Sequence, residues 1–313
     1  MKFLIYGAGV IGSIFAGKLA SGGYNITVLA RNQRYKDMTA NGIILQNAYS
    51  DRKEVSKVKV IDHLEPSDVY DYILVIMQKT QVNSVLPYLA KNQSHNIVFV
   101  VNNPLGYEEW SKCIGQNRLI IGFPAAGGEL KDGVVNYFIG RGIARVFQTT
   151  TFGELDGKAT PRLTELVKAF NKSHIPSVTN SNMEAWQKTH VALVTSIANA
   201  LYIHKSNNYA LSKSTEDIKL MIQGIKEGFQ VIEGLGYKVT PYKLQYFKLP
   251  VWFLAFIFKV IMSTKIAEVT MSKHTIVAHN EMSVLQEEFD ELIKKSNRTT
   301  PCIDKLRNIF NSL

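Results

Sequence analysis

The 313-residue chain lacks the features of a secreted, disulfide-stabilised or metal-binding protein. Its two cysteines, Cys113 and Cys302, match no metal-ligand spacing and are too few for a disulfide framework, which favours a reducing compartment. The apolar start, residues 1–6, ends at a glycine turn and is too short for the core of a signal peptide. We therefore expect a cytoplasmic protein without a metal site.

Long hydrophobic runs are also missing. The longest run, 249–262, begins at Leu249, ends at Met262 and contains Pro250 and Lys259, so it falls short of the about 18 to 20 residues that span a bilayer. It predicts a buried helix at a domain or subunit interface, which either covers a ligand cleft or forms the seam of a homodimer. A peripheral membrane contact is the less favoured alternative, and we expect no membrane partner.

Positive charge is plentiful, with 36 lysines and arginines against 26 acidic residues and a net charge of +10. The basic residues are scattered singly and in pairs, without an arginine-rich run or a helix-turn-helix pattern. We expect no nucleic-acid partner, and expect a few of these cations to bind phosphate groups.

The composition, 46% hydrophobic and 20% charged, is that of an ordinary globular protein long enough for two domains. The first half alternates short β-branched runs with helical patterns, which predicts an α/β domain over 1–180. A helical pattern then continues to the end and predicts an all-helical domain over 181–313, with long helices at 183–203, 217–233 and 281–295. Expected strands are 3–6, 26–29, 72–76, 97–101 and 119–121, with a hairpin of 43–45 and 55–61 and an antiparallel pair of 134–139 and 143–147.

A glycine fingerprint lies between the first strand and the first helix. Its G-x-G-x-x-G pattern predicts a Rossmann-type dinucleotide-binding domain, because the glycines allow a tight turn, close approach of pyrophosphate and close helix packing. The phosphates would lie at the positive end of the helix. The less favoured alternative is a glycine-rich turn without a ligand. The predicted contacts are Gly7, Ala8, Gly9, Val10, Ile11 and Gly12.

The end of the second strand indicates which dinucleotide is bound. NAD sites usually place Asp or Glu there for the ribose 2′-hydroxyl, but this strand ends in Arg31 with no acid nearby. Arg31, assisted by Arg34, is suited to a 2′-phosphate, which predicts NADP as the cofactor. The alternative is that Arg31 is an exposed loop arginine.

Beyond these motifs, the chain resembles the ketopantoate reductase family, NADPH-dependent reductases of 2-dehydropantoate, nearly from end to end. The order and spacing of several landmarks carry the resemblance. They are Gly7 to Gly12 with Arg31, Gln78-Lys79-Thr80-Gln81 after a strand, Asn102-Asn103 with Gly106 and Glu109, Trp186-Gln187-Lys188, and Glu281 before Thr300-Pro301.

The resemblance implies a role for each of three residues. Lys188 would be the catalytic lysine, Glu281 the acid that anchors the substrate, and Asn103 the amide beside nicotinamide and substrate. This chemistry is sensible, because hydride delivery to a ketone places negative charge on oxygen, which a nearby ammonium stabilises and protonates. Glu281 would accept a hydrogen bond from a substrate hydroxyl and hold Lys188 in place. Taken alone, each residue would more often be structural.

The chain departs from the family pattern at several positions near these landmarks. Gln78 stands where the family has a lysine, and Lys79, one step later, is its replacement among the predicted cofactor contacts. Pro104 follows Asn103 where glycine is usual. His190 and His274 are further candidate site residues of this branch, although helix histidines are more often packed or at the surface.

Two more departures concern the substrate. Ala192 and Ser196 occupy positions where the family has asparagines that contact substrate, while Thr195 and Asn199 lie on roughly the same helical face. We therefore predict weakened recognition of ketopantoate.

The leading hypothesis is an NADPH-dependent reductase of a small 2-oxo acid, with ketopantoate, and hence pantothenate biosynthesis, as the best guess. One alternative is a reductase of a different 2-oxo acid or ketone. Another is a non-enzymatic NADP-binding sensor, which would need neither Lys188 nor Glu281.

Overall fold

The computed structural model describes residues 1–48, 50–140, 149–277 and 279–311, without the side chains of residues 274, 277, 310 and 311. The chain forms two compact units. Unit 1 comprises Met1–Val101 and Tyr107–Met183, and unit 2 comprises Asn102–Gly106 and Glu184–Leu313. The predicted fold class is confirmed: a mixed α/β sheet domain precedes a helical region.

Unit 1 is built on an eight-stranded sheet with the order β12-β11-β8-β7-β6-β1-β2-β5. Six neighbouring strands, in the order β5-β2-β1-β6-β7-β8, are parallel. This is the third-second-first-fourth-fifth-sixth order of a Rossmann-type domain. Its strands are β1 (Lys2–Tyr6), β2 (Asn25–Leu29), β5 (Lys59–Ile61), β6 (Tyr72–Val75), β7 (Ile97–Val100), β8 (Leu119–Phe123), β11 (Thr150–Glu154) and β12 (Ser177–Thr179).

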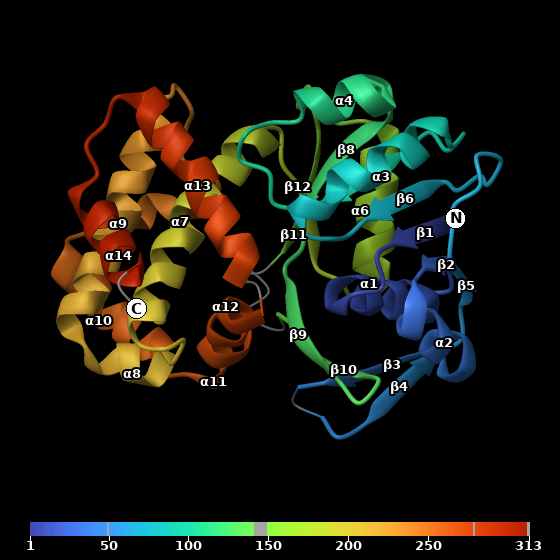
Figure 1. Cartoon of the computed structure of the whole chain (residues 1–313), viewed down its shortest axis with the longest axis horizontal. Helices are drawn as coiled ribbons and strands as arrows, with labels where there is room; N and C mark the ends of the chain where they lie inside the picture. Colours follow the sequence, from blue (N-terminus) through green and yellow to red (C-terminus); the bar gives the residue numbers. More distant parts are fainter. Residues whose placement is uncertain (49, 141–148, 278, 312–313) are drawn as a thin grey trace. The chain divides into compact units, whose positions relative to one another are not determined.

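Helices cover both faces of this sheet (Figure 1). On one face, the rings of Phe15 and Phe170 meet edge to face with centroids 5.1 Å apart, which joins α1 to α6. On the other face, Phe99 packs against Trp110 of α4. The continuous apolar runs predicted for β6 and β7 are buried for this reason. The helices of unit 1 are α1 (Val10–Ser21), α2 (Asn32–Asn41), α3 (Lys79–Lys91), α4 (Glu108–Ile114), η1 (Gln116–Arg118) and α6 (Pro161–Lys172).

A second sheet, of order β4-β3-β10-β9, packs on α1 and corrects two strand predictions. Residues 55–61 are not one hairpin arm, because β4 pairs with β3 whereas β5 joins the main sheet beside β2. The strand at 134–139 is confirmed, but its antiparallel partner is 126–131, and the expected partner at 143–147 lies outside the described residues. The strands are β3 (Ile43–Asn47), β4 (Lys53–Ser56), β9 (Ala126–Lys131) and β10 (Val134–Ile139).

Unit 2 contains the long helices expected from the apolar periodicity, packed around their own core. Its elements are α7 (Met183–Ile203), α8 (Asn208–Lys213), α9 (Thr215–Gly234), η2 (Tyr242–Lys248), α10 (Val251–Met262), α11 (Lys265–Ala267), the π-helical η3 (Glu268–Ser272), α12 (Lys273–Val277), α13 (His279–Ser296) and α14 (Pro301–Asn311).

The apolar run at 249–262 forms a helix as predicted, but the helix is not buried. Leu254, Ala255 and Met262 face the core of unit 2, whereas Trp252 and Phe256 are exposed. No helix among the described residues is both long and apolar enough to cross a membrane.

Candidate active site

The glycine loop of unit 1 connects β1 to α1. Gly7 has a φ of +127°, and a Cβ there would lie 2.1 Å from the Ile76 carbonyl oxygen, beyond the end of β6. A Cβ on Gly12 would lie 1.9 Å from the Gly7 carbonyl oxygen. Both positions therefore require glycine, and the loop sits beside β1 and β6, where the strand order reverses.

Gly9 differs from these two glycines. It is exposed, has the extended conformation of an N-cap, and a Cβ there would meet no protein atom within 4 Å. As a glycine, the N-cap residue has no side chain to accept a hydrogen bond from the first amides of α1. The space beside Gly9 is therefore open on the protein side. This cradle fits a dinucleotide pyrophosphate.

Two arginines flank this loop. Arg31 is the exposed N-cap residue of α2. Burial raises the pKa of Tyr6 at the end of β1, and the Arg31 guanidinium partly offsets this rise. Arg34 folds back from α2, with Nε donating to the Ala8 carbonyl at 3.1 Å and an Nη to the Ser13 hydroxyl at 2.9 Å. Arg34 therefore braces the glycine loop, and Arg31 is the cation left at the surface.

The predicted cofactor residues after β6 lie at the start of α3. Gln78 is exposed and is the N-cap residue of α3, and its carbonyl accepts a hydrogen bond from the Gln81 amide at 3.0 Å. Lys79 is the half-buried first residue of the helix. Both follow a parallel strand that neighbours β1, at the edge where open α/β sheets bind ligands.

In unit 2, the loop 102–106 holds two asparagines with unsatisfied oxygens. Asn103 is 3% exposed, its amide N–H donates to Gln187 Oε1 at 3.4 Å, and its Nδ2 donates to the Gly106 carbonyl at 2.5 Å. Within the described part of the chain, Oδ1 of Asn102 and of Asn103 is buried without a hydrogen-bond partner. A buried acceptor left unpaired costs about 1–3 kcal/mol, so both oxygens are suited to a donor from a ligand.

Lys188 is buried in α7, with its side chain 5% exposed. Its Nζ donates to Glu184 Oε1 at 2.6 Å and lies 4.8 Å from the centroid of the Tyr237 ring, while the Tyr237 hydroxyl donates to the same Glu184 oxygen at 2.7 Å. Burial raises the pKa of Glu184, but the hydrogen bonds from Lys188 and Tyr237 outweigh it and the net pKa is lowered. Burial and the Glu184 carboxylate raise the pKa of Tyr237 to about 12.

Glu281 does not pair with Lys188. It lies in the first turn of α13, where its charge suits the helix dipole, and its Oε1 accepts a hydrogen bond from Asn102 Nδ2 at 3.2 Å. The loop 102–106 thus contacts both α13, through Asn102, and the residue before Lys188, through Asn103. Sequence reasoning missed Glu184 and Tyr237 as partners of Lys188.

The two departures downstream of Lys188 have a packing explanation. A Cβ on Gly228 of α9 would lie 3.0 Å from the Ala192 Cβ, and one on Gly224 would lie 3.2 Å from the Ser196 hydroxyl oxygen. Both residues are buried. Small side chains therefore face each other where α7 and α9 pack closely, and Ala192 and Ser196 face α9.

The other candidates on α7 already have partners. Thr195 Oγ1 donates to the Val191 carbonyl at 2.8 Å, and Asn199 Nδ2 donates to Gln286 Oε1 on α13 at 2.9 Å. The His190 ring stacks on Trp186. His274 belongs to α12, and its side chain lies outside the described residues.

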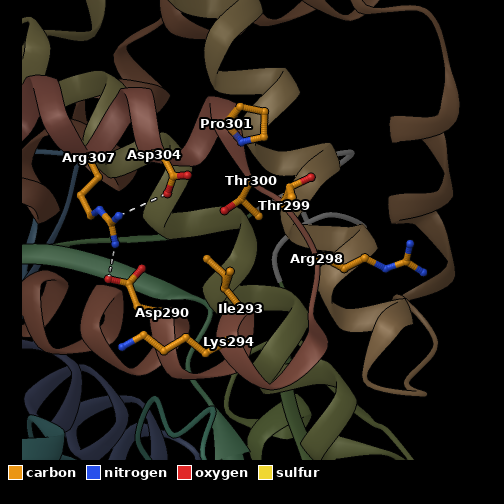
Figure 2. A pocket seen from close by; sticks show the side chains of 9 residues that line it. All are labelled: Asp290, Ile293, Lys294, Arg298, Thr299, Thr300, Pro301, Asp304 and Arg307. Atoms are coloured by element: carbon orange, nitrogen blue, oxygen red, sulfur yellow. Dashed lines mark hydrogen bonds and ion pairs between the residues drawn. The ribbon is translucent and has the colours of Figure 1, made fainter.

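A shallow pocket between the end of α13 and the start of α14 contains none of the predicted site residues. Figure 2 shows Arg307 held between Asp290, at 2.6 Å, and Asp304, at 3.2 Å. The first amides of α14 are taken by Glu227, which accepts from the amide N–H groups of Cys302 and Ile303. These groups hold the helices together. The pocket is lined by Asp290, Ile293, Lys294, Arg298, Thr299, Thr300, Pro301, Asp304 and Arg307.

Known proteins resemble this chain in both sequence and fold. Residues 3–156 match the family "Ketopantoate reductase PanE/ApbA". The 2-dehydropantoate 2-reductase of Pyrococcus horikoshii is 22% identical over 246 residues, which cover 78% of each chain.

Solved structures share the fold of the whole chain. The 2-dehydropantoate 2-reductase of Geobacter metallireducens has a TM-score of 0.78 at 16% identity, with 100% of this chain and 99% of that chain covered. A D-mandelate dehydrogenase with NADH and anilino(oxo)acetate has a TM-score of 0.76 at 16% identity, covering 100% and 97%. At 16% identity, these structures show a common fold.

A glycine-loop α/β domain followed by a helical domain with a buried lysine is the architecture that this chain shares with these oxidoreductases. The family match over residues 3–156, together with the curated and structural relatives, supports the ketopantoate reductase family, whose members are oxidoreductases that bind a nicotinamide dinucleotide.

Proposed function

We propose that the protein is an NADPH-dependent reductase of a small 2-oxo acid, with ketopantoate as the first substrate to test. The observation that carries this proposal is the buried Lys188 ammonium, held by Glu184, in the same unit as two buried amide oxygens that lack donors. A purely structural lysine would leave those oxygens unexplained. A cofactor carboxamide and a substrate hydroxyl are groups that can satisfy them.

The glycine loop and Arg31 are proposed to hold the cofactor. The pyrophosphate would lie over Gly9 and the amides of α1, and the Arg31 guanidinium would bind a 2′-phosphate, because β2 ends without an acid. Gln78, Lys79 and Asn103 are the further proposed contacts. Bound NADPH supplies the hydride.

Lys188 is proposed as the general acid. A lysine ammonium has three donors, so one can bind Glu184 while the others reach the substrate carbonyl oxygen. Lys188 Nζ would give a proton to that oxygen as carbon 2 is reduced, which would leave a 2-hydroxy acid as the product. Glu184 and Tyr237 position Lys188. Glu281, fixed through one oxygen by Asn102, would use the other for a substrate hydroxyl.

A second candidate is a reductase of a 2-oxo acid with an apolar substituent. The packing of Ala192 and Ser196 against α9 favours it, because neither position offers an amide to a hydroxylated substrate such as ketopantoate. The D-mandelate dehydrogenase, a structural relative, was solved with an oxo acid that has an aromatic substituent. We expect the KM for ketopantoate to exceed that for the best substrate.

The test is NADPH oxidation by the full chain with ketopantoate, phenylglyoxylate and branched aliphatic 2-oxo acids, with NADH in parallel. Turnover of one or more of these acids, with NADPH preferred, supports the proposal. Tight NADPH binding without turnover of any 2-oxo acid or 2-hydroxy acid would favour the sensor instead. The cytoplasmic location expected from the sequence remains a prediction.

A further inference from the structure

One segment of unit 2 is rich in exposed apolar side chains. Within the described ranges, nineteen large apolar residues are exposed, and eight of them fall in the short stretch 242–261. Several exposed apolar side chains in one short segment are typical of an interaction surface, whereas single exposed apolar residues are not. We call this stretch the aromatic face. Its members are Tyr242, Tyr246, Leu249, Trp252, Phe253, Phe256, Val260 and Ile261.

Most of the aromatic face lies on α10, whose other side is already buried. α10 packs on α8 and α9, and Leu254 and Met262 enter the core of unit 2. Trp252 and Phe256, one turn apart on the opposite side, are 70% and 67% exposed. A surface helix ordinarily carries polar residues there. Stability of unit 2 does not explain these side chains.

The charged residues of the segment that carries the aromatic face all have one sign. Residues 235–267 contain five lysines and no aspartate or glutamate. Lys248 and Lys265 are exposed near the two ends of α10. Lys226 of α9 donates to the Leu249 carbonyl at 2.7 Å, and Lys259 donates to Thr215 Oγ1 at 3.0 Å, which keeps both ammonium groups beside α10.

We propose that the aromatic face docks on an anionic lipid surface. Tryptophan, tyrosine and apolar side chains favour the boundary between headgroups and acyl chains, and lysines beside them are attracted to anionic headgroups. A second copy of the chain fits less well, because a two-fold contact brings the same lysines together without acids from this stretch to pair them. The proposal is independent of the reductase function.

Tryptophan fluorescence of the full chain gives a direct assay. Trp110 and Trp186 are buried, at 4% and 9% exposure, so a change in emission on binding reports Trp252. Vesicles of phosphatidylcholine mixed with phosphatidylglycerol should shift the emission to the blue and protect it from acrylamide, whereas pure phosphatidylcholine vesicles should do so much less. Added salt should weaken binding, because it screens the lysines.

Co-sedimentation with the same vesicles tests the residues. The double variant Trp252→Ser, Phe256→Ser should lower the partition coefficient about tenfold or more, and Lys248→Gln, Lys265→Gln should lower it severalfold for anionic vesicles only. Tyr88→Ser, at a 56%-exposed site on α3, is the matched control and should change nothing. Thermal unfolding confirms that each variant is folded.

Equal binding to neutral and anionic vesicles, or binding to neither, would overturn the proposal. A dimer in solution that Trp252→Ser dissociates, with no vesicle binding, would assign the aromatic face to self-association.

Discussion

Replacing Glu184 with glutamine leaves the buried Lys188 ammonium without its carboxylate. A hydrogen bond to a charged group contributes about 1.5–3 kcal/mol to stability. The Glu184 side chain is 46% exposed, so solvent screening reduces this contribution, and we expect Glu184→Gln to lower the free energy of unfolding by about 1–2 kcal/mol at neutral pH. Denaturant titration, followed by circular dichroism, measures the loss.

The pH dependence of this loss has a definite sign. The folded-state pKa of Glu184 is lowered, because the hydrogen bonds from Lys188 and Tyr237 outweigh the effect of burial. Such a carboxyl contributes stability above its unfolded pKa of about 4.3 and loses it as the pH falls through the folded pKa. The difference in the free energy of unfolding between wild type and Glu184→Gln should therefore be largest at neutral pH and decrease steadily as the pH is lowered.

Glu216→Gln is the matched control. Glu216 pairs with Lys219 at 3.0 Å on α9, but its side chain is 84% exposed, so its loss should change stability by less than about 0.5 kcal/mol. If Glu184→Gln destabilises no more than Glu216→Gln, or if its effect is unchanged in acid, Glu184 does not hold Lys188 as described.

Three further substitutions test the cofactor and substrate residues. Arg31→Ala should weaken NADPH binding by about 1.5–3 kcal/mol in titration calorimetry and leave NADH affinity nearly unchanged; equal losses would refute the NADP assignment. Gly9→Ala should leave the thermal midpoint nearly unchanged, because its Cβ meets no protein atom within 4 Å. The same variant should bind both NADPH and NADH more weakly. Unchanged affinity would contradict the placement of the pyrophosphate at this loop. Glu281→Ala should raise the KM of the best 2-oxo acid more than it lowers kcat, and a loss confined to kcat would contradict an anchoring role.

The parallel sheet was predictable because its strands carry their signal locally. β6 and β7 are β-branched apolar runs, and the glycine loop has the spacing that the turn demands. The segment 55–61 carried no such signal, because its interspersed apolar and polar residues show no break although they belong to two different sheets.

The contacts of the site depended on tertiary pairing. Glu184 stands four residues before Lys188, a spacing that indicates contact on a helix, but nothing local connects Tyr237 to them. Ala192 and Ser196 were predicted to be lost substrate contacts, but the sequence could not show that Gly228 and Gly224 of α9 pack against them. The composition of 249–262 likewise could not show that one side of α10 stays exposed.

The most direct test of the account is turnover by Lys188→Ala with the best 2-oxo acid, measured beside NADPH affinity in the same preparation. We predict that NADPH binding stays within about twofold of wild type while kcat falls about 100-fold or more, the contribution expected of a positioned general acid. Unchanged turnover would contradict the proposed mechanism, because the reductase would then lack its acid.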